Sequence, residues 1–265
     1  MQKIVVITGG TSGIGKDMAD YYLGKGETVC VIARNIEENK ENYYSCDVSC
    51  ENQVKQTIEA IGNKYGHIDI LINNAGFGLS GALELIPREE AKKIFDVNMH
   101  GAFMVNKYAI KYMAKNSLIL HVASACALFP LPFRGLYCAS KSAINMYSDC
   151  LRMELKPLGI KVVSICPGDV KTPFTKNRVK IFETNERYGD RIANSAHNID
   201  KNQDKRMDSK IVAKKMVKIS YKKNPKPMYI IGGKYKFLYF IKNVFPKRTL
   251  LYFIEKMFNG KKRKK

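Results

Sequence analysis

Short apolar runs alternate with longer amphipathic stretches along most of the chain. Runs rich in Val and Ile are typical of strands buried on both faces. The predicted strands are 3–8, 27–33, 43–46, 68–72, 118–123, 160–165 and 227–231. Apolar residues at helical spacing predict helices between them, at 14–23, 53–65, 88–114, 135–158 and 208–222. This alternation over 265 residues predicts one large α/β domain.

The segment after the last predicted strand has a different pattern. Residues 233–265 contain eleven Lys or Arg and one acid, Glu255, and therefore carry +10 of the net charge of +21. Aromatic and aliphatic residues interleave with these charges, and Pro246 divides the segment into two short helices. Basic amphipathic helices of this kind favour peripheral contact with an anionic membrane. The alternative is that both helices cover a substrate pocket or a subunit interface, with a solvated KKRKK end.

Composition limits the classes of protein further. The seven cysteines are scattered, without a CxxC pair or zinc-site spacing, which predicts reduced core residues of a cytoplasmic protein and no metal site. The chain enters a strand at once and has no apolar run of about 20 residues, so we expect neither a signal peptide nor a membrane-spanning helix. No recognition motif accompanies the basic charge, which argues against nucleic-acid binding.

A glycine-rich turn joins the first predicted strand to the first helix in the sequence TGGTSGIG. A strand, a glycine turn and a helix in this order bring backbone N–H groups close to a pyrophosphate. We therefore predict a nucleotide site there. Its residues are Gly9, Thr11, Ser12, Gly13, Ile14 and Gly15.

The second predicted strand ends at Arg34, at the position that faces the adenosine ribose in such folds. An arginine there attracts a 2′-phosphate, whereas a carboxylate would repel it. Arg34 therefore favours NADP over NAD. The third predicted strand ends at Asp47 and Val48, which we expect beside the adenine.

Three further chain segments follow predicted strands or interrupt a helix. The fourth strand ends in Asn74, Ala75 and Gly76, where small and amide residues allow a turn beside the cofactor. Asn98 lies within an apolar helical face. It is either a hydrogen-bonded core amide or the anchor of a water that relays protons to Lys141, a residue of the next predicted helix. The sixth strand is followed by a chain reversal expected at the nicotinamide end, with Pro167, Gly168, Val170 and Thr172.

The chemically most informative spacing is Tyr137 and Lys141, with Ser124 thirteen residues before the tyrosine. On a helix, the tyrosine and the lysine lie one turn apart on the same face. An ammonium beside a phenol lowers the pKa of the phenol from about 10, so that it can exchange a proton with an alcohol. Ser124, at the end of a strand, would offer its hydroxyl to the same substrate oxygen.

These motifs occur together in one order, and the chain resembles the short-chain dehydrogenase/reductase family over residues 1 to about 175. The resemblance implies a doubly wound, mainly parallel Rossmann-type sheet with helices on both faces, in a catalytic domain spanning residues 1–232. It also implies hydride transfer between NAD(P) and an alcohol or carbonyl. Tyr137 would be the proton donor or acceptor, with Lys141 lowering its pKa and binding the nicotinamide ribose. Ser124 would orient the carbonyl, and Asn98 would anchor a water.

One cofactor position departs from the pattern of NADP-using relatives. Some of them carry a basic residue where this chain has Ser12, so the preference for NADP rests on Arg34 alone. The polar segment 173–207 occupies the place of the substrate lid, and family habit implies a homodimer or homotetramer.

The segment from Leu131 to Val162 resembles the branch that includes 17β-hydroxysteroid and retinol dehydrogenases, which implies a hydrophobic alcohol or ketone as substrate. Phe129, Leu131 and Phe133 would line its pocket, unless they only pack a loop. The alternatives are a reductase of a 3-oxoacyl or small-ketone substrate, and a non-enzymatic protein that senses NADP or binds a membrane surface.

Overall fold

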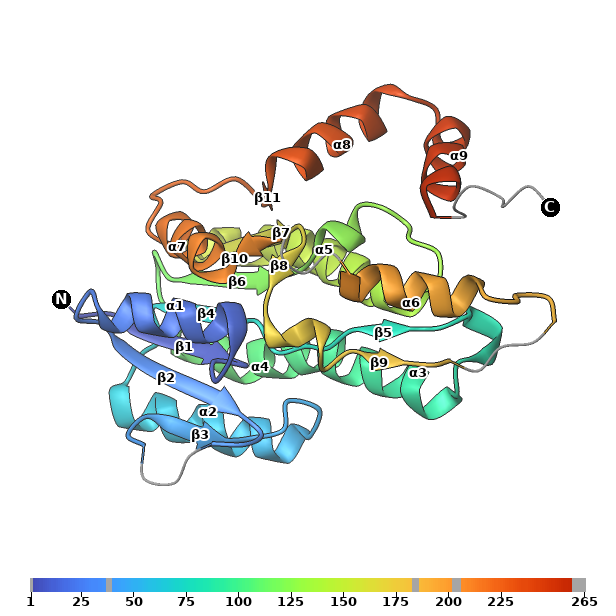
Figure 1. Ribbon diagram of the computed structural model, residues 1–265. Helices are drawn as coiled ribbons and strands as arrows, with labels where there is room; N and C mark the ends of the chain where they lie inside the picture. The colour runs from blue at the N-terminus through green and yellow to red at the C-terminus, as the bar shows by residue number, and fades with distance from the viewer. Residues whose placement is uncertain (1, 37–39, 183–185, 202–205, 259–265) are drawn as a thin grey trace.

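A computed structural model describes residues 2–36, 40–182, 186–201 and 206–258 (Figure 1). Its centre is a seven-stranded parallel sheet, which confirms the predicted doubly wound architecture. In spatial order the strands are β11 (Met228–Ile231), β7 (Lys161–Pro167), β6 (Leu118–Val122), β4 (Ile70–Asn73), β1 (Ile4–Thr8), β2 (Thr28–Ala33) and β3 (Tyr43–Ser45). The chain therefore winds outward in two directions from β1, and β1 and β4 are neighbours at the point where the direction changes.

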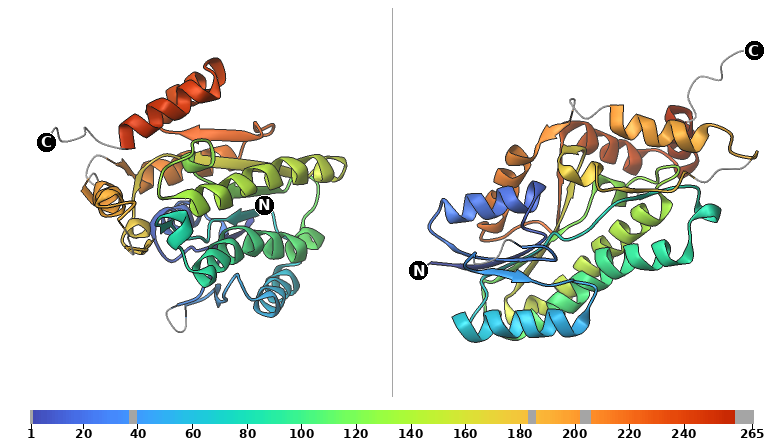
Figure 2. Two further views of the ribbon diagram at one scale, coloured as in Figure 1. Left: turned by 90° about the vertical axis from the view of Figure 1, so that its right-hand side faces the viewer. Right: turned by 60° about the horizontal axis from the view of Figure 1, so that its bottom comes forward.

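Helices cover both faces of this sheet, as the two views of Figure 2 show. One face packs against α1 (Gly13–Leu23) and α7 (Ser209–Ser220), and the other against α2 (Glu51–Tyr65), α4 (Gly101–Ala109) and α5 (Gly135–Leu155). Successive residues of β1 alternate between the two cores: Val5 and Ile7 face the first, and Val6 faces the second. Two-sided burial explains why the strands appear as continuous apolar runs.

The helical stretch predicted at 88–114 is divided into segments. It consists of α3 (Arg88–Phe95), a π-helical turn η2 (Asp96–His100), α4, and a 3-10 turn η3 (Ile110–Tyr112). The π turn places Asn98 where its amide bonds the backbone of Phe77. A π turn widens the helix and is frequent at functional sites. Further short helical turns are η1 (Leu83–Leu85), η4 (Ala125–Ala127) and η5 (Lys156–Leu158), and one more lies in the predicted lid.

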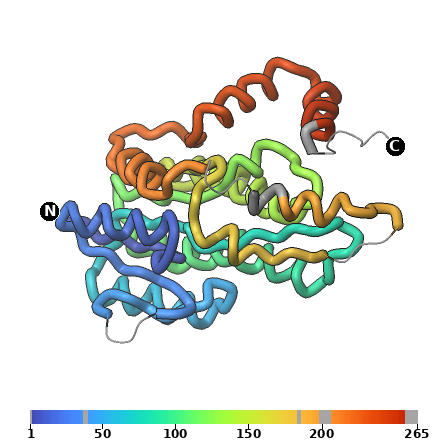
Figure 3. Tube along the Cα trace, in the orientation of Figure 1, coloured from blue at the N-terminus to red at the C-terminus, as the bar shows by residue number. Residues whose placement is uncertain are grey.

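The predicted lid, residues 173–207, crosses the molecule in Figure 3 as the yellow-to-orange part of the trace. Its regular elements are η6 (Pro173–Thr175), β9 (Val179–Lys180), α6 (Arg191–Lys201) and β10 (Met207–Asp208). In α6, Ile192, Ser195 and Ala196 lie at helical spacing and are buried, which explains a helix in a segment expected to be a polar loop. Strand β9 pairs with β5 (Leu79–Ser80), and β10 pairs with β8 (Val170–Lys171).

The C-terminal segment forms two helices on either side of Pro246, as predicted: α8 (Gly233–Val244) and α9 (Lys247–Phe258). Helix α8 leads away from β11, and α9 turns back toward the body of the molecule (Figure 1). Leu250 and Ile254 of α9 are buried in one apolar cluster with Phe129. The predicted solvated end at 261–265 lies outside the described residues.

The remaining sequence expectations concern cysteines, metals and membranes. All seven cysteines are free, and four of them are buried. His121 is a buried core residue whose ring bonds Asn106 and Ser148 at 2.8 Å each, and burial lowers the pKa of this ring to about 3. Within the described ranges, no cluster of His, Cys, Asp or Glu suits a metal ion. A search of the same ranges finds no helix with the length and apolar character needed to span a membrane.

Candidate active site

The segments that follow the strand ends meet in one cavity of about 980 Å³. It extends from the end of β2, past the junction of β1 and β4, to the C-terminal helices. Most of the predicted site residues line it together: Gly9, Thr11, Ser12, Gly13, Ile14, Arg34, Asp47, Val48, Asn74, Ala75, Gly76, Ser124, Phe129, Leu131, Tyr137, Lys141, Pro167, Gly168, Val170 and Thr172. A position at the change of winding direction is where open α/β sheets bind ligands.

The glycine turn has the backbone geometry that the sequence predicts. Gly9 and Gly13 adopt φ values of +67° and +53°, which favour glycine. Helix α1 begins at Gly13, and its N-cap Ser12 makes no side-chain capping hydrogen bond, so the first N–H groups of the helix are available to an anion. A Cβ at Gly15 would overlap the carbonyl oxygen of Gly9. Gly15 therefore shapes the turn without lining the cavity.

A network of hydrogen bonds joins this turn to the end of β4. The Thr8 hydroxyl accepts the backbone N–H groups of Asn74 and Ala75, both at 3.0 Å. The Asn74 Nδ2 donates to the carbonyl oxygens of Thr8 (3.1 Å) and Gly9 (3.0 Å). The two segments are therefore held as one rigid rim beside the predicted nucleotide site.

The predicted adenosine end also comes together. The exposed Arg34 lies at the end of β2, and its carbonyl oxygen accepts the hydroxyl of Ser45 at 3.0 Å. One carboxylate oxygen of Asp47 accepts both the backbone N–H and the hydroxyl of Ser49, at 2.9 and 2.6 Å. Val48 is buried against Gly101. A Cβ at Gly101 would lie 2.9 Å from the Val48 side chain.

The catalytic residues predicted from the sequence come from two elements. Ser124 follows β6 and caps η4, accepting the backbone N–H of Cys126 at 3.1 Å. Tyr137 lies in the first turn of α5, and Lys141 lies one turn later on the same face. Both are buried, and the Lys141 Nζ donates to the Val122 carbonyl oxygen at 2.9 Å.

The ionisation of Tyr137 differs from the expectation. Burial raises the pKa of the phenol above its ordinary value, and the charge of Arg178 and a hydrogen bond with Ser124 oppose this rise. Arg178 and not Lys141 is thus the main positive group that favours the phenolate here. A phenol with a raised pKa stays protonated at neutral pH, which suits proton donation to a carbonyl oxygen.

Asn98 and Lys141 both adjoin Gly76. A Cβ at Gly76 would lie 2.9 Å from the Asn98 Oδ1 and 3.3 Å from the Lys141 Nζ, so glycine is needed there. The Asn98 Oδ1 accepts the Phe77 N–H at 3.0 Å, and its Nδ2 donates to the Phe77 carbonyl and to the Ser140 hydroxyl, both at 3.1 Å. These bonds fix the loop after β4, while the role of Asn98 as a water anchor stays a prediction.

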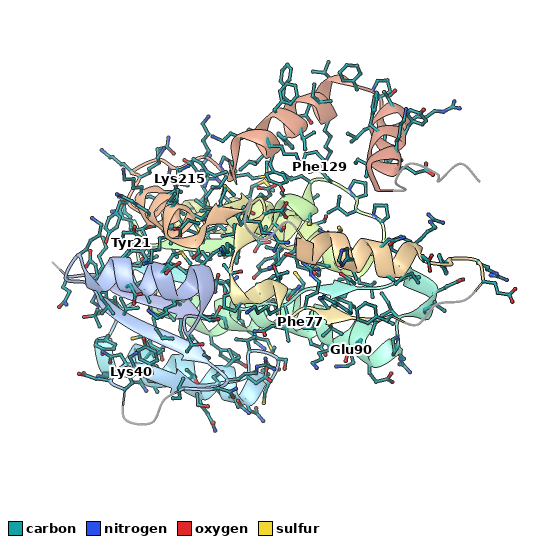
Figure 4. The ribbon with its side chains drawn as sticks, viewed as in Figure 1. Tyr21, Lys40, Phe77, Glu90, Phe129 and Lys215 are labelled. Carbon is teal, nitrogen blue, oxygen red and sulfur yellow. The ribbon has the colours of Figure 1, made fainter. Side chains whose placement is uncertain are left out.

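The substrate end of the cavity includes residues that sequence reasoning did not assign. Helices α8 and α9 contribute Leu238, Ile241, Phe253 and Ile254, among others. Their amphipathic pattern was a usable signal, and it supports the alternative in which both helices cover the pocket. In Figure 4, Phe129 lies toward α8 and Phe77 toward β5 and β9, and both line the cavity.

Phe133 is the one predicted pocket residue that does not line this cavity. It adopts a φ of 60°, and its carbonyl oxygen accepts the Gly81 N–H at 2.9 Å. Its ring meets the lid residue Tyr188 edge-on, with 6.1 Å between the ring centres. Phe133 thus holds the lid in place instead of facing the cavity.

Comparison with known proteins agrees with this geometry. Residues 3–181 match the family model described as short chain dehydrogenase. The chain belongs to the short-chain dehydrogenase/reductase family. It is 35% identical to a 3-ketodihydrosphingosine reductase of Bacteroides thetaiotaomicron, over 84% of this chain and 85% of that protein. It is also 30% identical to a 3beta-hydroxysteroid dehydrogenase of Mediterraneibacter gnavus, over 66% and 68% of the two chains.

Solved structures of short-chain dehydrogenases are similar as well. A Streptomyces avermitilis enzyme superposes with a TM-score of 0.82 over 98% of both chains, at 21% identity. ElxO with NADP bound has a TM-score of 0.72, 29% identity and coverage of 89% and 99%. A Brucella melitensis 3-ketoacyl-(acyl-carrier-protein) reductase complexed with NADH has a TM-score of 0.71, 26% identity and coverage of 87% and 97%.

The protein is therefore an oxidoreductase of this family, which acts on CH–OH or keto groups with a nicotinamide cofactor. Its residues fit such a cofactor, because the start of α1 is uncapped and borders the cavity of about 980 Å³ that extends to Ser124 and Tyr137. When bound, the nicotinamide supplies or accepts the hydride. The roles that the sequence predicts for the chain's own residues, orienting the carbonyl or hydroxyl at Ser124 and moving the proton at the Tyr137 hydroxyl, stay predictions.

The state of Lys141 predicts a pH dependence of stability. Burial lowers the pKa of its ammonium from 10.5 to about 8. Between these two values the unfolded chain binds the proton and the folded chain does not, so stability rises with pH. From pH 7.5 to 9.5, the free energy of unfolding of the wild type should rise by about 2 kcal/mol relative to Lys141→Met, measured in urea. Lys55→Met, at an exposed site on α2, should behave as wild type; an unchanged difference between wild type and Lys141→Met would contradict the buried charge.

Proposed function

We propose that this enzyme is an NADP-preferring oxidoreductase that transfers a hydride between nicotinamide and a secondary alcohol or ketone on a hydrophobic molecule. The observation that carries the proposal is the apolar wall around Ser124 and Tyr137. Phe129 and Leu131 line the cavity, as do Leu238, Ile241 and Phe253 of the C-terminal helices. Apolar walls with few polar groups at the reacting centre suit a steroid, bile acid, retinoid or other lipid.

The names of relatives favour the same substrate class. One is a ketodihydrosphingosine reductase and another a hydroxysteroid dehydrogenase, each named for a keto or hydroxyl compound of lipid type. The alternative, a reductase of 3-oxoacyl or small-ketone substrates, is favoured by the similarity to a 3-ketoacyl reductase structure. The non-enzymatic alternative, a protein that senses NADP or binds a membrane surface, has less support because Ser124, Tyr137 and Lys141 all line one cavity.

The proposed function predicts which ketones the protein reduces. With NADPH, purified protein should reduce ketosteroids, oxo bile acids, retinal or long-chain ketones faster than short ketones. Tyr137→Phe should lower kcat by about 100-fold or more, because it removes the proton donor, while NADPH binding measured by fluorescence persists. Turnover of small ketones alone would contradict the lipid proposal. Turnover that survives in Tyr137→Phe would contradict the assigned proton donor, and no turnover with any ketone would favour the non-enzymatic alternative.

The preference for NADP rests on Arg34, which is exposed at the rim of the cavity. Arg34→Asp should shift the ratio of kcat/KM for NADPH over NADH toward NADH by about 10- to 100-fold at low salt, because it replaces an attractive charge with a repulsive one. The matched control is Arg88→Asp, at an exposed arginine outside the cavity, which should leave the ratio unchanged. Equal ratios in wild type and Arg34→Asp would sink the preference.

We also propose peripheral contact with the inner face of a membrane. The outer face of α8 and α9 exposes Phe240, Val244 and Tyr252 beside exposed basic residues such as Lys236 and Arg248. Aromatic and basic side chains on one face suit an anionic lipid surface. Phe240→Glu should reduce sedimentation with phosphatidylglycerol vesicles several-fold, whereas Leu23→Glu, at an exposed leucine of α1, should not. Absence of vesicle binding by the wild type would overturn the proposed membrane contact.

A homodimer or homotetramer is the corresponding proposal for self-association. Helix α5 exposes Met146 and Met153, and the neighbouring segment α4 exposes Phe103. Exposed apolar residues of this kind mark candidate interfaces. A monomer by light scattering at micromolar concentration would remove this proposal.

A further inference from the structure

The substrate end of the cavity contains a cation, Arg178, beside the predicted catalytic tyrosine. Arg178 lies between η6 and β9 and lines the cavity. The carbon of its guanidinium group is 5.1 Å from the centre of the Tyr137 ring and 5.6 Å from the centre of the Phe174 ring. Arg178 is thus packed against the phenol that exchanges the proton.

The fold provides a fitted space for this guanidinium group. A Cβ at Gly78 would lie only 2.6 Å from the Arg178 Cζ, so any other residue at 78 would displace the arginine. The pairing of β5 with β9 fixes the backbone on both sides, and the Val179 N–H donates to the Gly78 carbonyl oxygen at 2.9 Å. Backbone pairing therefore fixes the position of Arg178 beside Gly78.

The surroundings of Arg178 are positively charged. Arg134 and Arg206 line the same cavity, and burial, together with these two like charges, lowers the pKa of Arg178. Among the described residues, no carboxylate forms an ion pair with Arg178, and its buried Nε makes no hydrogen bond. Its Nη1 has one long contact, 3.5 Å to the Ser80 hydroxyl.

The acids in the cavity have other partners. Asp47, at the adenosine end, accepts two hydrogen bonds from Ser49. Asp169 accepts the hydroxyl of Tyr235. A half-buried cation that lacks a carboxylate partner is costly, and binding of an anion offsets this cost.

We propose that Arg178 binds an anionic group of the substrate, a carboxylate, phosphate or sulfonate, next to the carbonyl that reacts at Tyr137. Guanidinium groups bind such anions through two parallel hydrogen bonds. The anion site rests on the proposed function, and the two together imply that the substrate is an amphiphile. Its apolar part packs on Phe129 and Phe253, and its anionic group lies at Arg178.

The test compares charged and neutral ketones of equal length. The probes are oxododecanoic acids with the ketone at carbons 3 to 6, each as the acid and as its methyl ester, with NADPH and the full chain. The best acid should have a KM at least about 10-fold below that of its ester, since the ester has no charge to pair with Arg178. Equal KM values for every acid and ester pair would overturn the proposal while leaving the oxidoreductase function intact.

Variants assign the effect to one residue. Arg178→Gln should raise the KM of the acid about 10- to 100-fold and leave the KM of the ester unchanged, while loss of the charge beside Tyr137 should change kcat for the acid and the ester alike. Arg178→Lys should recover part of the loss, because it keeps the charge. The control is Lys176→Gln, at an exposed lysine of the same segment outside the cavity, which should have no effect. Weaker NADPH binding in Arg178→Gln, with unchanged acid selectivity, would assign Arg178 to a cofactor phosphate and overturn the proposal.

A measurement without turnover separates this proposal from the proposed function. In calorimetry, dodecanoate should bind the full chain, dodecanol should bind about 10-fold or more weakly, and Arg178→Gln should abolish that difference. If no ketone is reduced, the proposed function fails, yet this preference would still support an anion site at Arg178. If dodecanoate and dodecanol bind alike, the anion site is overturned whatever the outcome of the assays.

Discussion

The hydrogen bonds between the ends of β1 and β4 are the interaction on which the site depends. The Thr8 hydroxyl and the Asn74 amide join two strands that are adjacent in the sheet but about 65 residues apart in the chain. Gly15 permits this approach, because a Cβ there would overlap the Gly9 carbonyl. With these two ends held together, the start of α1 faces the cavity on one side, and the loop held by Asn98 faces it on the other.

The cavity combines residues at strand ends and first helical turns with residues of the predicted lid and the C-terminal helices. Strand ends and the first turns of α1 and α5 position the groups for hydride and proton transfer, where small displacements would be costly. The predicted lid, α8 and α9 also line the cavity, and we propose that Arg178 and the apolar residues of these helices supply the contacts that distinguish substrates. Segments outside the strand and helix framework are where related enzymes of one fold can differ in specificity.

The sheet, its flanking helices and most of the residues that line the cavity at the glycine turn and the strand ends could be predicted from the sequence, because local pattern and short motifs specify them. Ser124, Tyr137 and Lys141 come together as expected. What could not be predicted depends on contacts between distant segments. In the sequence, Arg178 looks like any solvated charge in a polar stretch. In the fold, the pairing of β5 with β9 places it against Tyr137. The raised pKa of Tyr137 likewise follows from burial that only the folded chain creates.

The most direct test of the account is a crystal structure of the protein with NADPH and the best oxododecanoic acid or its unreactive alcohol product. We expect the pyrophosphate at the N–H groups that begin α1, the ligand oxygen between Ser124 and Tyr137, and the carboxylate against Arg178. The aliphatic chain should run toward Phe253 and Ile254. A ligand whose oxygen lies away from Tyr137, or whose carboxylate points into solvent past the C-terminal helices, would contradict it.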